Sequence, residues 1–119
     1  MNPSQKNNNP LNLRFAGQTE ATGQSEQGFA VFPTPMAGWR AAHAQLKLDQ
    51  SRSLTIGQEI NKWAPPIEND TPAYLKFVCR ELWVTSDTPL TEISIYALAG
   101  VMACQEGYYT KNEEKIWNG

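Results

Sequence analysis

The sequence predicts a small α+β domain that is mainly helical, with one N-terminal β-hairpin and about four helices after it. Three observations support this fold class. Large apolar residues alternate with polar ones near the N-terminus, apolar residues recur at helical spacing through the rest of the chain, and a capping residue opens each helical stretch. With 119 residues, of which 40% are hydrophobic and 18% charged, the chain can form one hydrophobic core.

Two short strands and the polar stretch between them predict the hairpin. Residues 11–16 (LNLRFA) alternate large apolar with polar side chains, as a half-buried strand does. Residues 29–32 (FAVF) form the second candidate strand. The intervening residues 17–28 contain three glycines and no large apolar side chain, which is typical of a loop.

The first two helices are predicted from their capping residues and prolines. Thr34 is a natural N-cap and Pro35 suits the first helical position, so a helix is expected from there to about residue 50. Ser53 or Thr55 caps a shorter helix. That helix must end before Pro65, because proline lacks the backbone donor that a helix needs and restricts the residue before it.

The third and fourth helices carry similar signals. Asp70 or Thr71 precedes a proline and is expected to cap the third helix. Residues 86–89 (SDTP) have the same pattern and are expected to open the fourth helix. Gly107 is a suitable residue to end that helix, because glycine readily adopts the left-handed conformation found there.

The chain is expected to be one domain with short polar ends. Residues 1–9 are polar, rich in asparagine and predicted to be a flexible N-terminus. Residues 10–107 are predicted to form the single domain, and residues 108–119 a C-terminal tail. A cleft between the hairpin lobe and the helical lobe is the expected ligand site.

Charge and hydropathy exclude several classes of partner. The formal net charge is −2 and the ten Lys and Arg residues are scattered, so nucleic acid is not an expected partner. No apolar run of about 18 residues is present, which predicts no membrane span. The polar start lacks the apolar region of a secretory signal, so synthesis in the bacterial cytoplasm without a signal peptide is expected.

Cysteine and histidine usage predicts neither a metal site nor a cofactor. Cys79 and Cys104 are the only cysteines, neither is part of a CxxC pair, and His43 is the only histidine. Both cysteines lie in apolar helical patterns, which favours two buried thiols over a disulfide.

Four stretches are more specific than a generic helical domain requires. They are residues 9–14 (NPLNLR), 29–32 (FAVF), 38–41 (GWRA) and 63–71 (WAPPIENDT). This ordered set resembles a family of phage and mobile-element proteins described as virion structural proteins or as lytic-transglycosylase-like proteins. The resemblance covers about residues 8–90, and residues 63–71 are its most distinctive part. A more distant similarity links the hairpin and the helix after it to flagellar-type glucosaminidases, which have a lysozyme-like fold.

The resemblance implies a lysozyme-like domain of phage or prophage origin that interacts with the cell wall. Its implied partners are peptidoglycan or other virion proteins, and its implied place of action is the periplasmic cell wall, reached in association with a virion. An enzyme of this kind would cleave the glycan strand as a lytic transglycosylase or muramidase. Two alternatives stay open: a non-catalytic binding or structural module of a virion or secretion apparatus, and a small inhibitor of a host protein.

Cleavage of a glycan needs a carboxylic acid that protonates the glycosidic oxygen. Glu20, in the glycine-flanked hairpin loop, is one candidate. Glu68, on a loop stiffened by two prolines, is the other. Each has a simpler interpretation, as a solvated loop glutamate or, for Glu68, as an ion-pair partner of Arg14 or Arg40. Asp70 is better explained as a helix cap.

The position of these two candidates differs from the arrangement that the resemblance implies. In lysozyme-like enzymes the principal acid usually ends a helix that precedes the hairpin. Here only nine polar residues precede Pro10, and none of them is Asp or Glu. The sequence therefore offers no acid before the hairpin.

Four further residues are candidates for substrate binding. Asn12 and Arg14 project from the opposite face of the first strand to its leucines, where they could meet a polar ligand or a carboxylate such as that of Glu68. Asn69 lies in the distinctive loop, and Tyr74 could stack on a sugar ring.

The tryptophans are less specific signals. Trp39 and Trp63 lie on apolar helix stripes, which favours a role in the core over stacking on sugar rings. Trp83 follows a leucine on the buried side of its helix and is expected to be more exposed.

Overall fold

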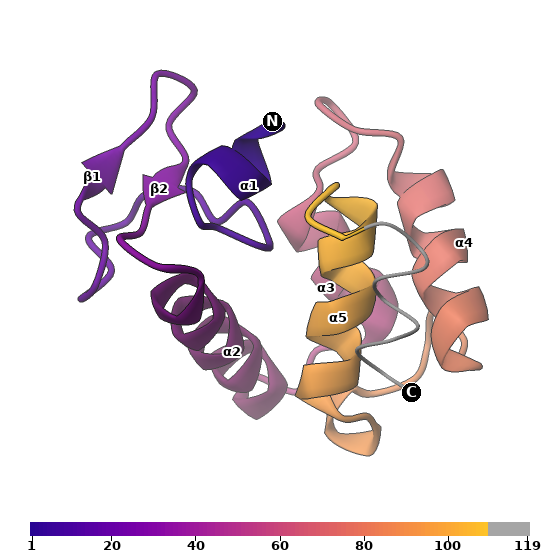
Figure 1. Ribbon diagram of the computed structural model, residues 1–119. Coiled ribbons are helices and arrows are strands. Elements are labelled where there is room, and N and C mark those ends of the chain that lie inside the picture. The colour runs from indigo at the N-terminus through magenta and orange to yellow at the C-terminus, as the bar shows by residue number, and fades with distance from the viewer. Residues whose placement is uncertain (110–119) are drawn as a thin grey trace.

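The computed structural model describes residues 1–109. Its elements, in chain order, are α1 (Pro3–Lys6), β1 (Gly23–Gln24), β2 (Ala30–Val31), α2 (Pro35–Ser51), α3 (Ile56–Trp63), α4 (Thr71–Leu82), the 3-10 helix η1 (Leu90–Glu92) and α5 (Ile95–Gln105). Figure 1 shows the hairpin next to α1 and the start of α2, with α3, α4 and α5 grouped on the other side of the molecule. The predicted class, a mainly helical α+β domain with one hairpin, is confirmed.

The hairpin is made from different residues than predicted. The strands β1 and β2 pair antiparallel, with Gly23 opposite Val31, so β1 lies inside the stretch expected to be a loop. Residues 11–16 do not form a regular strand. They make one isolated bridge, Arg14 to Phe29, because Asn12 adopts a positive φ of 52° that interrupts the extended run.

The first nine residues pack into the fold, whereas the sequence predicts a flexible start. Asn2 caps α1 by accepting a hydrogen bond from the backbone of Gln5. The Asn9 side chain is completely buried: its Nδ2 donates to the carbonyls of Leu13 and Ala30, each at 2.9 Å, and its Oδ1 accepts from the Leu13 backbone at 2.9 Å. This amide ties the N-terminal segment to the hairpin.

The helix caps follow the sequence closely. The side chains of Thr34, Thr55 and Asp70 each accept a backbone hydrogen bond at the start of α2, α3 and α4. Gln58 completes a reciprocal capping box with Thr55. The fourth helix begins later than predicted, since residues 90–92 form a 3-10 turn and Ser94 is the cap that opens α5.

The core lies where α5 packs between α2 and α4, and where α3 packs on α4. Its largest fully buried apolar side chains come from nearly every element: Leu11, Phe32, Leu46, Ile56, Ile60, Val78, Leu90, Leu98, Val101 and Met102. Cys79 and Cys104 are half-buried and do not form a disulfide with each other. None of the helices in the described part of the chain has the length and apolar character needed to cross a membrane. The predicted tail beyond Tyr109 lies outside the described residues.

Candidate functional site

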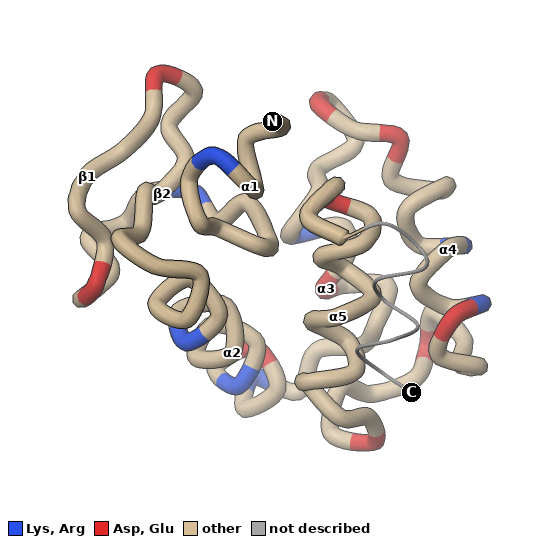
Figure 2. Tube along the Cα trace, in the orientation of Figure 1, with Lys and Arg blue, Asp and Glu red and all other residues tan. Residues whose placement is uncertain are grey.

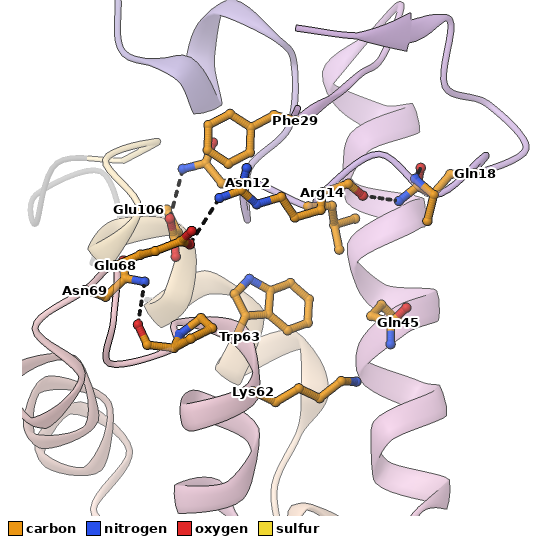
Figure 3. A pocket seen from close by; sticks show the side chains of 13 residues that line it. Asn12, Arg14, Gln18, Phe29, Gln45, Lys62, Trp63, Glu68, Asn69 and Glu106 are labelled. Carbon is orange, nitrogen blue, oxygen red and sulfur yellow. Dashed lines mark hydrogen bonds and ion pairs between the residues drawn. The ribbon is translucent and has the colours of Figure 1, made fainter. Parts of the chain in front are cut away.

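A pocket of about 510 Å³ lies between the hairpin lobe and the helical lobe, as the two-lobe prediction expected. Figure 3 shows it from close by, with side chains from α2, α3, the loop before α4 and the end of α5 converging on residues of the hairpin lobe. Its lining combines carboxylates, cations, amides and aromatic rings: Asn12, Leu13, Arg14, Ala16, Gln18, Phe29, Gln45, Lys62, Trp63, Pro65, Glu68, Asn69 and Glu106.

Glu106, at the end of α5, is the pocket carboxyl with the most polar partners. Asn12 Nδ2 donates to its Oε1 at 2.9 Å, and the Tyr74 hydroxyl donates to its Oε2 at 2.9 Å. Burial raises the pKa of Glu106, and the hydrogen bonds from Asn12 and Tyr74 oppose that rise. The pKa of Tyr74 lies well above its usual value, chiefly because of burial, so its hydroxyl keeps its proton and remains a donor.

The end of α5 packs against the segment that leads into the hairpin. Asn2 Nδ2 donates to the carbonyl of Gly107 at 2.5 Å, and Ser4 Oγ donates to the carbonyl of Glu106 at 3.3 Å. The C-terminal end of α5, which Glu106 caps, therefore lies next to the N-terminal segment, although the two are far apart in the sequence. No sequence pattern singles out Glu106, because its contacts with Ser4 and Asn12 form only when the two ends of the chain meet.

Glu68, on the loop before α4, also lines the pocket and pairs with Arg14. The Arg14 guanidinium reaches Glu68 Oε2 at 3.2 Å, donates to the carbonyl of Gln27 at 2.7 Å, and lies 4.8 Å from the centre of the Phe29 ring. Both charged side chains are more than half exposed. The expected contact between Arg14 and Glu68 is thus present.

Glu20, the other predicted acid, has a different environment. Its two carboxylate oxygens accept from Arg40 Nε at 2.7 Å and from an Arg40 terminal nitrogen at 2.6 Å, and it is not among the residues that line the pocket. The hydrogen bonds from Arg40 lower the pKa of Glu20, so it stays ionised where a proton donor must hold its proton.

The predicted binding residues are divided between the pocket and the layer behind it. Asn12 and Asn69 line the pocket, and Asn69 Nδ2 also holds its own loop by donating to the carbonyl of Pro65 at 3.1 Å. Tyr74 is only 4% exposed and contacts the site through Glu106. Trp63 lines the pocket while its indole nitrogen donates to the carbonyl of Leu11 at 2.8 Å.

The remaining tryptophans have other surroundings. Trp39 is half-buried and stacks on His43, with ring centres 5.6 Å apart. Trp83 is 94% exposed, in agreement with the sequence expectation.

Lys62 and Gln45 form the wall of the pocket between α2 and α3. The Lys62 ammonium pairs with Asp49 Oδ1, and Gln45 Nε2 donates to the same oxygen at 3.2 Å. Asp49 itself is completely buried behind this wall.

Two further properties of the described residues bear on the ligand of the pocket: where the basic residues lie, and whether metal-binding side chains gather. Figure 2 shows the Lys and Arg residues of the described chain distributed over several elements. Within residues 1–109, no three His, Cys, Asp or Glu side chains gather in a group that could hold a metal ion. The groups that line the pocket can take part in acid–base chemistry and hydrogen bonding, through its carboxyl, cationic and amide side chains.

Comparison with known proteins relates the chain to a phage. No family model matches it. It is similar to a protein of Pseudoalteromonas phage PM2 named Protein P5, with 30% identity over 124 aligned positions, which cover 92% of this chain and 76% of P5.

Proposed function

The chain belongs to the family of Protein P5 of Pseudoalteromonas phage PM2, and from this premise we propose that it is a virion-associated protein that cleaves the glycan strands of peptidoglycan. The observation that carries the proposal is Glu106, a protonatable carboxyl that lines a pocket between two lobes. The amide, cationic and aromatic side chains around it match the chemistry of a saccharide, which presents hydroxyls, amides and apolar ring faces.

In this proposal Glu106 is the proton donor. Burial keeps its proton bound to higher pH than an exposed glutamate would allow, which is the property required of a general acid near neutral pH. Glu106 gives its proton to the glycosidic oxygen as the bond between that oxygen and the sugar carbon breaks. A hydroxyl of the same sugar then attacks the carbon and returns its proton to the Glu106 carboxylate, as in lytic transglycosylases, where one carboxyl suffices.

The position of Glu106 supports this role. Lysozyme-like enzymes usually place the principal acid at the end of a helix that precedes the hairpin. In this chain Glu106, the C-cap of α5, comes after the hairpin in sequence but lies next to the segment that leads into it. In this proposal Glu106 takes the role of the acid that the sequence does not offer before the hairpin.

Glu68 is the second carboxylate of the proposed site. Paired with Arg14 at 3.2 Å, it stays close to the pocket mouth, where a negative charge stabilises positive charge that develops on the sugar during bond cleavage. Arg14, Asn12 and Asn69 are the proposed binding residues around it.

Purified protein incubated with peptidoglycan sacculi tests the proposal, with turbidity and released muropeptides as readouts. We expect Glu106→Gln to lower release by about a hundredfold or more, because general acid catalysis contributes on that order. Glu68→Gln is expected to lower release less. Glu20→Gln is the matched control and should release muropeptides like the wild type, since Glu20 pairs with Arg40 outside the pocket.

A non-catalytic binding module of the virion is the second candidate function. It is favoured by the ion pair with Arg14 that already engages Glu68, the second carboxylate of the pocket. Sedimentation with sacculi without muropeptide release, unchanged in Glu106→Gln, would select this candidate and reject the catalytic one. Lack of sedimentation and release would reject both.

A further inference from the structure

Two carboxyl groups are buried together behind the pocket wall. Asp49 on α2 and Glu59 on α3 are both 0% exposed. All the donors that reach Asp49 converge on Oδ1: the Lys62 ammonium, Gln45 Nε2 at 3.2 Å and Arg52 at 3.5 Å. Asp49 Oδ2 and both oxygens of Glu59 receive no hydrogen bond from the described residues.

Two ionised carboxylates are not stable in this arrangement. A buried acceptor without a donor is destabilising, and two like charges close together destabilise the fold further. A single proton between the two groups removes one of the charges and supplies the missing donor. Burial and the adjacent Asp49 raise the pKa of Glu59 to about 8, which agrees with a proton that is held at neutral pH.

Among residues 1–109, few charged groups surround the pair. Lys62 and Arg52 face it from α3 and the end of α2. Tyr74 on α4 is close enough to Glu59 for the two to interact electrostatically, and Tyr74 in turn binds Glu106 at the end of α5. With one shared proton, the net charge of the four groups is +1: two cations, Lys62 and Arg52, against one ionised carboxyl of the Asp49–Glu59 pair. The two cations are partly exposed, and Lys62 lines the pocket.

We propose that Asp49 and Glu59 share one proton and thereby position Lys62 and Gln45, so that loss of the proton reorganises the pocket wall between α2 and α3. When both carboxyls are ionised, the added negative charge draws the Lys62 ammonium inward to neutralise it. The pocket wall between α2 and α3 then no longer presents the Lys62 ammonium to a ligand. Asp49 and Glu59 are positioning residues, and the proton makes the pocket sensitive to alkaline pH.

The protonation state of Glu59 is followed directly by NMR, from the chemical shift of its side-chain carboxyl carbon as the pH is changed. The signal is assigned by comparison with Glu59→Gln. We expect Glu59 to titrate near pH 8 in the wild type. Asp49→Asn removes the neighbouring charge and should move that titration to lower pH. Titration of Glu59 near the value of an exposed glutamate, unchanged by Asp49→Asn, would overturn the proposal.

Thermal stability gives a second readout that does not need the NMR assignment. The pKa of Glu59 is raised on folding from 4.5, so its stabilising effect is complete below about pH 4.5 and is lost as the pH rises to about 8. We expect the Tm of the wild type to fall across this range and the fall to be smaller in Glu59→Gln. Glu92→Gln, at an exposed site, is the control that should retain the wild-type slope. An equal slope in Glu59→Gln would contradict the shared proton.

The expected effect of the shared proton on ligand binding rests on the proposed function. It is tested by binding to sacculi at about pH 6 and about pH 9. Wild-type binding should weaken at the higher pH, and binding by Glu59→Gln should change less. If no variant binds sacculi at either pH while Glu59 still titrates near pH 8, the proposed ligand is wrong and the shared proton stands. If the wild type binds equally at both pH values, the link between the proton and the pocket is wrong.

Discussion

The hydroxyl of Tyr74, buried on α4, donates a 2.9 Å hydrogen bond to Glu106 Oε2 at the end of α5. This contact joins the core to the pocket. It holds one oxygen of the proposed proton donor in place, while Asn12 from the hairpin lobe holds the other at 2.9 Å. The orientation of the carboxyl is therefore set by two elements that lie far apart in the sequence.

Replacing Tyr74 with phenylalanine tests this relationship. The pKa of Glu106 should rise further, because the lost hydrogen bond favours the ionised form. Muropeptide release should then persist to higher pH than in the wild type, with a lower maximum because the carboxyl is less well oriented. Stability above the pKa of Glu106 should fall by about 1–3 kcal/mol, as expected for a buried carboxylate that loses a donor. A pH profile identical to that of the wild type would argue against Glu106 as the proton donor.

Asn9→Ala should be among the most destabilising single changes in the N-terminal segment. The amide is fully buried and makes three hydrogen bonds to the backbone of Leu13 and Ala30. Their loss removes the Asn9 partner of the Leu13 amide and of the Ala30 carbonyl, while the Leu13 carbonyl keeps its bond from the Ala30 backbone. We expect a cost of about 3 kcal/mol in the free energy of unfolding, to be measured by denaturant unfolding. Asn61→Ala is the control, because Asn61 is exposed and makes one local bond, and it should cost less than about 1 kcal/mol. Equal effects would show that the N-terminal segment does not depend on Asn9.

Gly38→Ala should destabilise the protein although alanine favours helices. A Cβ at this position would lie 1.9 Å from the carbonyl oxygen of Asn8, so α2 and the N-terminal segment would have to separate. We expect a loss of several kcal/mol, on the order of 2–4. Ala44→Gly, at an exposed site in the same helix, removes a Cβ and should cost only about 1 kcal/mol. A neutral Gly38→Ala variant would mean that the two segments are not in contact.

Arg14→Lys should weaken binding to sacculi while leaving the free energy of unfolding nearly unchanged. The Arg14–Glu68 pair is exposed on both sides, so unfolding free energy should change by less than about 1 kcal/mol. Lysine cannot reproduce the planar contact with Phe29 while it also reaches Gln27 and Glu68. Binding to sacculi, measured by co-sedimentation, is therefore expected to weaken severalfold. If binding is unchanged, Arg14 is a structural residue of the hairpin lobe only.

Local sequence signals determined the helices of this protein. Thr34 caps its helix as predicted, and Thr55 and Asp70 are each one of the two caps that the sequence left open for the next two helices. A cap can be predicted locally because it depends on a side chain and the backbone three residues later. The failures were also local. Asn12 turns the chain where an alternating pattern predicted a continuous strand, and the polar asparagines at the start satisfy buried backbone groups that no sequence pattern reveals.

The site was decided by the tertiary structure. The sequence singled out Glu68 and Arg14 and suggested their contact, since both lie in distinctive motifs. It could not identify Glu106, because this residue acquires its burial, its partners Asn12 and Tyr74, and its place next to the hairpin lobe only when the ends of the chain meet. The same holds for Asp49 and Glu59, two acidic residues of a type that is usually exposed, which lie on separate helices and share one buried environment in the fold. Periodicity and caps depend on neighbours along the chain, whereas the protonation and orientation of a carboxyl depend on neighbours in space.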